Sequence, residues 1–347
     1  MPPQKNLARL TALSLLMTLT GLAATGLNAI SHEQPAPQQP LAATEPTSAA
    51  IAFNPATDHP THIPTDREQT AVPYDDGRFV IGRDERKPVT SRSFPWSAVG
   101  RLELQDANGQ TISTCTGTLV DADLVLTNAH CLQQQAAGSF ISSERYRQQQ
   151  SQASAPKFVF KPSLINGIAL DEATVISYRA GWSEDTATNS TAADWAILKL
   201  DAPLGNIYGS LGFLDLNISD PNVTNRLAEN TTLIGYSGDF PTPALSEFGQ
   251  PAETAGIDEA CSIVGIFPDG DTFAGTVMHD CDATPGSSGG PILFTANDGI
   301  VYIIGLNAYQ TPLAEAYTLP DGTVTRGLNA GVQVSHWAPT FFEMLTP

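Results

Sequence analysis

Short apolar runs, each bounded by turn-forming residues, are the feature that most constrains the fold of this chain. They occur between Ser97 and Val334, are rich in Val, Ile, Leu and Thr, and are separated by Gly, Pro, Asn and Asp. The runs are SAVGRLEL, TGTLVDADLVLTNA, DWAILKL, TTLIGYSG, GPILF, GIVYIIGLNAY and NAGVQV. Their length and composition are typical of strands, and Asp106–Gly109 and Asp321–Gly322 have the composition of hairpin turns. The pattern predicts an all-β sandwich or barrel.

Helical periodicity is scarce. In SHWAPTFFEML the residues Trp337, Phe341 and Leu345 recur on one face, which predicts a helix at the C-terminal end. The Gln- and Ser-rich segment 133–156 is expected to be a surface loop between strands.

The first 79 residues do not resemble part of a fold. Lys5 and Arg9 precede an uncharged apolar run that ends in small residues near Ala29, which is the layout of a secretory signal peptide at 1–29. An uncleaved membrane anchor is the alternative. Residues 30–79 are rich in Pro, Ala, Thr and Gln and are expected to be a pro-segment or a disordered spacer.

Residues 80–347 are long enough for one large β domain or two small barrels. The formal net charge of the whole chain is −19, which argues against nucleic acid as a partner because phosphates repel an acidic surface. After signal removal no segment is apolar for long enough to cross a membrane.

The chain has four cysteines, Cys115, Cys131, Cys261 and Cys281. An even number behind a signal peptide indicates two disulfides, for which three pairings are possible. Pairing of sequence neighbours would close two short loops. A metal site is the alternative, but the chain has no C-x-x-C motif and no neighbouring His pair, so we expect no metal and no other cofactor.

The stretch TPGSSGGP at residues 284–291 is poor as a helix and as a strand, because its glycines add conformational entropy that folding must remove. It could be a linker, or a tight turn whose backbone approaches a substrate. Cys281 precedes it and the run PILF follows it, and a turn fixed between rigid elements fits these neighbours better than a linker does.

Three stretches together supply the parts of a nucleophilic site. LVLTNAHC places His130 after an apolar run, DWAILKL begins with Asp194, and Ser288 lies among glycines. A serine hydroxyl needs a base to take its proton, and the base needs a carboxylate to orient it. The N–H groups of Gly286 and Ser288 are the expected oxyanion-hole donors, because a glycine at that position permits the turn that aims both at one point.

TNAHC, DWAILKL and GSSGGP resemble the His, Asp and Ser signatures of the chymotrypsin/trypsin-like serine proteases. Three further stretches, VIGRDERKPV…SFPWSAVGRL, LIGYSGD and HDCDATPGSSGGPI, resemble the bacterial glutamyl-endopeptidase branch of that superfamily. The resemblance covers about residues 80–345. It implies a double six-stranded antiparallel β-barrel, about 80–205 and 206–347, with a C-terminal helix.

In such a fold the triad would lie in the cleft between the barrels. The resemblance places His130 and Asp194 on the first barrel and Ser288 on the second, and it supports a Cys115–Cys131 disulfide that braces the histidine loop. Trypsin-like zymogens carry an aspartate immediately before the serine, where it pairs with a newly freed N-terminal ammonium. Ser287 stands there in this chain, so a pro-segment would act differently, and we predict cleavage near Arg78–Val80.

The substrate preference is ambiguous in the sequence. Asp282 lies six residues before the serine, where a buried carboxylate would favour Lys or Arg, although glutamyl endopeptidases can also carry Asp there. Their glutamate-recognising histidine should fall in GLNAY, but this chain has Asn307. We expect Asn307, Ala308 and Tyr309 to line the pocket, and His279 either to reach it or to be structural.

The sequence therefore predicts a monomeric serine endopeptidase of the extracellular or periplasmic space, made as a precursor and acting on proteins or peptides. A catalytically inactive homologue that serves as a binding or adhesion module is the alternative. An esterase of the α/β-hydrolase fold is disfavoured, because that fold has the chain order Ser, Asp, His and this chain has the order His, Asp, Ser.

Overall fold

The computed structural model describes residues 80–134, 139–152, 154–185 and 189–345. The predicted signal peptide and pro-segment lie outside these residues, so both remain predictions.

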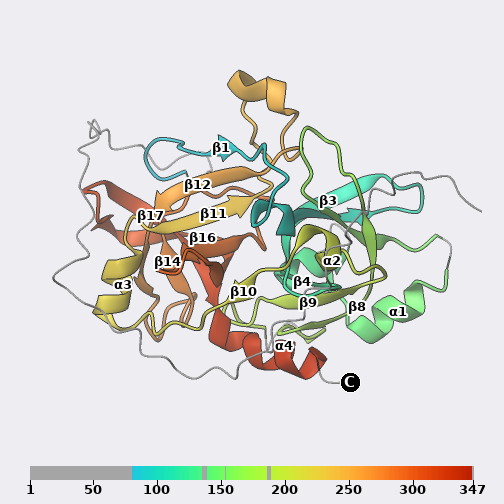
Figure 1. Cartoon of the computed structure of the whole chain (residues 1–347). Coiled ribbons are helices and arrows are strands. Elements are labelled where there is room, and N and C mark those ends of the chain that lie inside the picture. Colours follow the sequence, from blue (N-terminus) through green and yellow to red (C-terminus); the bar gives the residue numbers. More distant parts are fainter. Residues whose placement is uncertain (1–79, 135–138, 153, 186–188, 346–347) are drawn as a thin grey trace, which may run out of the picture. The chain divides into compact units, whose positions relative to one another are not determined.

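Six strands in the N-terminal half form a closed barrel in the order β2-β3-β4-β9-β8-β7 (Figure 1). Every pair within it is antiparallel. Its strands are β2 (Val99–Gln105), β3 (Thr111–Leu119), β4 (Leu124–Thr127), β7 (Lys157–Pro162), β8 (Ala173–Ala180) and β9 (Ala196–Leu200). The predicted turn at Asp106–Gly109 joins β2 to β3, where the Gly109 N–H donates to the Asp106 carbonyl at 3.0 Å.

A second sheet of nine strands contains most of the C-terminal half. Its strands are β1 (Lys87–Pro88), β10 (Gly212–Phe213), β11 (Thr231–Gly235), β12 (Gly256–Cys261), β13 (Ile263–Ile266), β14 (Val277–His279), β15 (Pro291–Thr295), β16 (Val301–Thr318) and β17 (Val324–Gln333). The all-β prediction is confirmed. Two short strands join this sheet from elsewhere in the chain: β1 pairs with β12, and β10 pairs with β16 in parallel. A separate two-stranded sheet consists of β5 (Gln133–Gln134) and β6 (Ser139–Phe140).

The predicted C-terminal helix is present as α4 (Ala338–Leu345), which follows the 3-10 turn η5 (Val334–His336). Trp337 and Phe341 are buried as predicted, and their rings pack against Phe213. Leu345, the third member of the predicted apolar face, is 44% exposed. Leu345 is the last residue of the helix and lies beyond the part that packs against Phe213.

The Gln- and Ser-rich segment was expected to be a loop, but it contains helix α1 (Ser143–Gln149). Ser142 caps the helix by accepting a hydrogen bond from the Arg145 N–H, and Tyr146 is fully buried. The Tyr146 hydroxyl donates to the Val175 carbonyl of β8 at 2.9 Å. A single buried aromatic residue therefore attaches this helix to β8, although its other residues are polar and form no apolar face.

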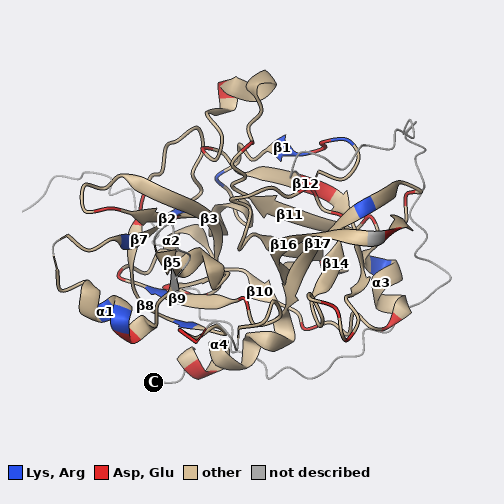
Figure 2. Cartoon of the chain, turned by 180° about the vertical axis from the view of Figure 1, so that it is seen from behind, with Lys and Arg blue, Asp and Glu red and all other residues tan. Residues whose placement is uncertain are grey.

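The other helical segments of the described residues are short and lie mostly between strands. They are α2 (Gly205–Tyr208), α3 (Pro221–Leu227), η1 (Trp96–Ala98), η2 (His130–Leu132) and η4 (Pro243–Phe248). Figure 2 shows acidic residues spread over loops and strand ends, and basic residues on α1, α3 and β1 among other places. No helix among the described residues is long and apolar enough to span a bilayer.

Two disulfides link neighbouring cysteines. Cys115–Cys131 joins β3 to η2 within the first barrel, and Cys261–Cys281 joins the end of β12 to the residues after β14. The first is the pairing that the resemblance implies, and it ties the segment that carries His130 to the adjacent strand. The predicted boundary near residue 205 lies between β9 and β10 and remains a prediction.

Candidate active site

His130 and Asp194 form a close pair at the edge of the first barrel. The Asp194 side chain is fully buried, whereas that of His130 is 24% exposed. The Asp194 carboxylate accepts the His130 backbone N–H at 2.8 Å through Oδ1, and its Oδ2 lies 2.6 Å from His130 Nδ1. Because one carboxylate binds both the backbone and the ring, it fixes the position and the orientation of the imidazole.

The barrel itself brings these two residues together. Strands β4 and β9 are antiparallel neighbours, with Thr127 opposite Ala196. His130 follows the end of β4 and Asp194 precedes the start of β9, so both lie at the same edge. Asn128 reinforces the arrangement, because its side-chain amide donates to the Asp194 carbonyl at 2.7 Å.

Two aromatic rings flank His130. The ring centroid of Tyr309 lies 5.8 Å from that of His130, and the Trp182 ring lies at 6.4 Å. Burial, together with the neighbouring Asp194 carboxylate, raises the pKa of Tyr309. The hydroxyl of Tyr309 therefore remains protonated beside Asp194.

The loop that carries Ser288 lies against the first barrel. The Thr116 N–H of β3 donates to the Ser288 carbonyl at 2.8 Å, and the Sγ of Cys131 lies 3.9 Å from the same carbonyl oxygen. Cys131 is the residue after His130. The structure therefore brings the Ser288 backbone beside the histidine segment, as expected for a site formed from both halves of the chain.

The N–H groups around Ser288 fall into two classes. Those of Ser287, Gly289 and Gly290 donate to the carbonyls of Thr284, Asn307 and Ser287, respectively. In the described part of the chain, the N–H groups of Gly286 and Ser288 donate to no protein acceptor. These are the two donors that the sequence predicts for an oxyanion hole.

Glycine is required at position 286. Its φ is +104°, and a Cβ added there would lie 2.4 Å from the Tyr236 carbonyl oxygen. The Gly286 carbonyl accepts the Thr116 hydroxyl at 3.0 Å, and that hydroxyl accepts the Tyr236 N–H at 2.9 Å. Thr116 of the first barrel thus connects the second sheet to the loop before Ser288.

The three residues expected to line the pocket lie on β16. Asn307 and Ala308 are 4% and 7% exposed, and Tyr309 is partly buried. The amide of Asn307 donates to the Ser287 carbonyl at 3.2 Å and to the Ser287 hydroxyl at 3.1 Å. Asn307 therefore holds the loop from behind, a role that its position in GLNAY did not indicate.

Asp282 is the candidate for binding a basic substrate side chain, and the structure describes its contacts within the protein. Its carboxylate accepts the backbone N–H groups of Ile81 at 2.9 Å and Glu85 at 3.1 Å, and it is only 5% exposed. The Asp282 N–H donates to the Asp258 carboxylate at 2.7 Å. Burial and the neighbouring Asp258 raise the pKa of Asp282. Asp282 therefore faces the N-terminal segment.

His279 is fully buried at the end of β14. Burial lowers its pKa to about 3, and the Asn307 side chain acts in the opposite direction. The imidazole is therefore neutral at physiological pH and packs behind Asn307 within the sheet.

The fold and site geometry agree with comparisons of the chain with known proteins. Residues 115–305, more than half of the 347-residue chain, match the family model of the trypsin-like peptidase domain. The chain belongs to the trypsin-like peptidases. The resemblance noted from the sequence motifs is thereby confirmed.

Two curated relatives of this trypsin-like peptidase come from Bacillus species. The extracellular metalloprotease of Bacillus subtilis is 29% identical over 143 residues, 41% of each chain. The glutamyl endopeptidase of Bacillus licheniformis is 24% identical over 163 residues, 47% of this chain and 43% of the relative. The match thus spans about two fifths of the length of these relatives.

A Glu endopeptidase solved in complex with MPD has the same fold. It aligns with a TM-score of 0.50 at 21% identity, over 76% of this chain and 98% of the solved one. At this identity the likeness establishes the fold alone. The first of the two predicted six-stranded barrels is present as a closed barrel, whereas the second half of the chain forms a nine-stranded sheet, and this fold is shared with the solved peptidase.

Sequence reasoning missed the residues that hold the Ser288 loop in this trypsin-like peptidase. Thr116 lies in the TCTGTL run of β3 and has the composition of an ordinary strand residue. Arg86, whose Nη1 donates to the Thr284 hydroxyl at 3.2 Å, belongs to a charged N-terminal segment that gave no signal of burial. The only available signal was the resemblance of residues 80–102 to a mature N-terminus, which indicates that the segment is retained but not what it contacts.

Proposed function

We propose that this protein is a secreted serine endopeptidase, made as a precursor, in which Ser288 is the nucleophile, His130 the general base and Asp194 the residue that orients it. The observation that carries the proposal is the buried Asp194 carboxylate 2.6 Å from His130 Nδ1. This contact leaves Nε2 of the same ring as the nitrogen that can accept a proton.

In the acylation step His130 Nε2 takes the Ser288 hydroxyl proton while Oγ forms a bond to the scissile carbonyl carbon. The carbonyl oxygen becomes an anion, and the N–H groups of Gly286 and Ser288 donate to it. The C–N bond then breaks, and the leaving amine takes the proton from His130. Water attacks the acyl-enzyme in the same way, losing a proton to His130, and the acid product leaves as Ser288 recovers its hydrogen.

Two features support an extracellular location. Both disulfides are of the kind that persists in oxidising compartments. The name of the Bacillus subtilis relative also describes an extracellular protein. The predicted signal peptide at 1–29 and the cleavage near Arg78–Val80 complete this proposal.

The proposed substrate pocket is lined by Asn307, Ala308 and Tyr309, without a free carboxylate from Asp282. The two Asp282 oxygens accept backbone N–H groups, so we propose no preference for Lys or Arg through Asp282. Cleavage of a peptide library tests this directly. A strong preference for Lys or Arg would restore Asp282 as a specificity residue and contradict the contacts described above.

Inhibition separates serine catalysis from metal catalysis, which the name of the Bacillus subtilis relative raises. Among the described residues, the two groups with metal-ligand chemistry are Cys115–His130–Cys131 and Cys261–Asp280–Cys281, and their sulfurs are used in disulfides. We therefore expect a fluorophosphonate to abolish peptidase activity and a chelator to leave it unchanged. Loss of activity with the chelator alone would refute the proposal.

The matched control is Ser288→Ala, which should be secreted and folded but inactive on peptide and ester substrates. If the unmodified protein cleaves no substrate after its precursor segment is removed, the protein is a binding module that retains the protease fold.

A further inference from the structure

The N-terminal segment lies against the loop that leads to Ser288. Ile81 and Glu85 donate their backbone N–H groups to the two oxygens of Asp282, and Ile81 and Asp282 are 201 residues apart in the chain. Strand β1 then pairs with β12, with Lys87 opposite Ile257. Cleavage near Arg78–Val80 would leave this segment on the mature protein.

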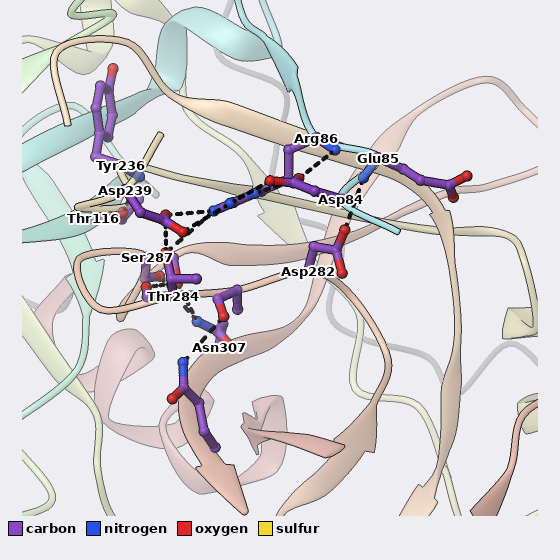
Figure 3. Close-up of polar contacts among 12 residues, drawn as sticks. Asp84, Glu85, Arg86, Thr116, Tyr236, Asp239, Asp282, Thr284, Ser287 and Asn307 are labelled. Carbon is purple, nitrogen blue, oxygen red and sulfur yellow. Dashed lines mark hydrogen bonds and ion pairs between the residues drawn. The ribbon is translucent and has the colours of Figure 1, made fainter. Parts of the chain in front are cut away.

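Arg86 is the deepest residue of this segment. Its side chain is 2% exposed, and its guanidinium bridges Asp84 and Asp239 (Figure 3). Nη1 donates to Asp239 Oδ1 at 3.0 Å, and Nη2 donates to Asp239 Oδ2 at 3.2 Å and to Asp84 Oδ2 at 2.8 Å. The guanidinium also lies 5.1 Å from the centre of the Phe240 ring. Because the buried guanidinium is hydrogen-bonded to two carboxylates and packs on an aromatic ring, its position is fixed.

Arg86 also contacts the Ser288 loop directly, through Thr284. Nη1 donates to the Thr284 hydroxyl at 3.2 Å, and that hydroxyl donates to Asp239 Oδ1. The Thr284 side chain is therefore held by the guanidinium and by its counter-ion together. Thr284 is 2% exposed, so water does not replace these bonds.

The backbone of Thr284 forms the base of the turn that carries the two unused N–H groups. Its carbonyl accepts the Ser287 N–H at 3.0 Å and the Ser287 hydroxyl at 2.7 Å. Gly286 precedes Ser287 and Ser288 follows it, so a shift of the Thr284 carbonyl moves both donors. Figure 3 shows Arg86, Asp239, Thr284 and Ser287 as one connected chain of polar contacts.

We propose that Arg86 is a positioning residue for the oxyanion-hole turn, acting through Asp239 and the Thr284 hydroxyl. In this chain Ser287 occupies the position where trypsin-like zymogens carry an ion-pairing aspartate. The ion pair Arg86–Asp239 supplies a fixed charge pair that contacts Thr284 at the base of the same turn. The inference rests on the proposed serine mechanism, because it concerns the donors that stabilise the oxyanion.

A purely structural role would have different consequences. If Arg86 only attached β1 to the sheet, its loss would lower stability without changing the chemistry of the molecules that remain folded. Lys87 provides the matched control, because it is the next residue and pairs with Glu259 at 3.0 Å on the surface, where its side chain is 69% exposed.

The test compares Arg86→Gln, Thr284→Val and Lys87→Gln in protein expressed from the full chain and allowed to mature. For each variant, kcat and KM on a peptide ester and the rate constant for fluorophosphonate labelling are measured per folded molecule. Thr284→Val removes only the hydroxyl and leaves the Arg86–Asp239 pair intact, so it remains informative if Arg86→Gln does not fold.

We expect kcat and the labelling rate to fall about tenfold for Thr284→Val and roughly 100-fold for Arg86→Gln, with KM changed less than about threefold, because small displacements of an oxyanion donor cost large factors in rate. Arg86→Lys should recover part of the loss, and Lys87→Gln should match the unmodified protein.

Unchanged labelling in Thr284→Val would overturn this inference while leaving the serine mechanism intact. An equal loss in Lys87→Gln would also overturn it, because the effect would then belong to the strand and not to the buried pair. If the unmodified protein itself fails to label, the proposed function falls, and the inference falls with it.

Discussion

The two halves of the candidate site are held in different ways. His130 and Asp194 lie at one edge of the closed barrel and are fixed by neighbouring strands, with Thr127 of β4 opposite Ala196 of β9. The Ser288 loop is instead held by groups distant in the chain: Thr116 from the first barrel and Asn307 from β16. The base is therefore positioned locally, whereas the nucleophile depends on contacts from several elements.

The comparison indicates where each half is vulnerable. The hydrogen bonds that fix the His130–Asp194 pair come from residues of the first barrel. The Ser288 loop contains glycines at 286, 289 and 290, whose freedom must be removed by outside contacts. We therefore expect substitutions around the loop to reduce catalysis at positions that touch no substrate.

The largest expected effect tests whether the two halves act as one unit. His130→Ala and Ser288→Ala should each lower kcat by about 10⁴-fold or more, and the double variant should lose no more than the worse single one, because residues of one nucleophilic unit are strongly non-additive. Kinetics of the three variants on a peptide substrate provide the measurement. Additive losses would show that the two halves act separately.

A second prediction concerns the connection between the halves. Thr116→Val removes the hydroxyl that donates to the Gly286 carbonyl and accepts the Tyr236 N–H, and it leaves both groups unpaired. We expect a loss of about 2–4 kcal/mol in the free energy of unfolding and a clear fall in kcat.

Thr118 offers the matched control on the same strand. Its hydroxyl is buried and has no hydrogen-bond partner within the described residues. Thr118→Val should therefore leave stability unchanged or raise it slightly, and leave kcat unchanged. Denaturant unfolding gives the free energy of unfolding of both variants. Equal losses would show that valine is unfavourable anywhere on this strand, and would contradict a specific contribution of the Thr116 hydrogen bonds.

The smallest predicted effects concern the pH dependence of stability, which has opposite signs for one buried carboxyl group in the first barrel and one in the second sheet. In the first barrel, burial raises the pKa of Glu103, but the Gln105 hydrogen bond and the charges of Arg101 and Lys161 outweigh it and lower the pKa to about 2. The ionised form is thus favoured by folding. Stability from this group is present above its ordinary pKa of 4.5 and is lost as the pH falls towards 2.

Glu103→Gln should therefore lower the free energy of unfolding by about 2–3 kcal/mol at pH 7 and leave it nearly unchanged near pH 2.

In the second sheet, burial raises the pKa of Asp258, so folding favours its protonated form. Its effect on stability is absent below pH 4 and becomes unfavourable as the pH rises towards 8.

Asp258→Asn should consequently stabilise the protein by about 1–2 kcal/mol at pH 8 and change little at pH 4. Thermal unfolding of both variants across pH 2–8 is the measurement. A pH dependence of the same sign for both would contradict the contrast between Glu103, a buried carboxylate paired with two cations, and Asp258, a buried carboxylate bonded to a backbone N–H.

The sequence named candidate residues in both halves of the site, but it did not indicate the distant contacts that hold the Ser288 loop. His130 and Asp194 could be placed because each lies next to an apolar strand run, and runs of that kind pair within a barrel. The contacts of Asp282 could not be predicted, because nothing in its neighbourhood indicates that Ile81 and Glu85, about 200 residues earlier, donate to it. Helix α1 was missed because a single buried residue, Tyr146, replaces the apolar stripe on which helix recognition depends.

The measurement that tests the central claim most directly is mass spectrometry of peptides from the mature protein after labelling with a fluorophosphonate. The serine mechanism predicts one adduct per molecule, located on Ser288, and no adduct in His130→Ala on the same timescale. An adduct on Ser287 or on another residue, or labelling that is independent of His130, would contradict it.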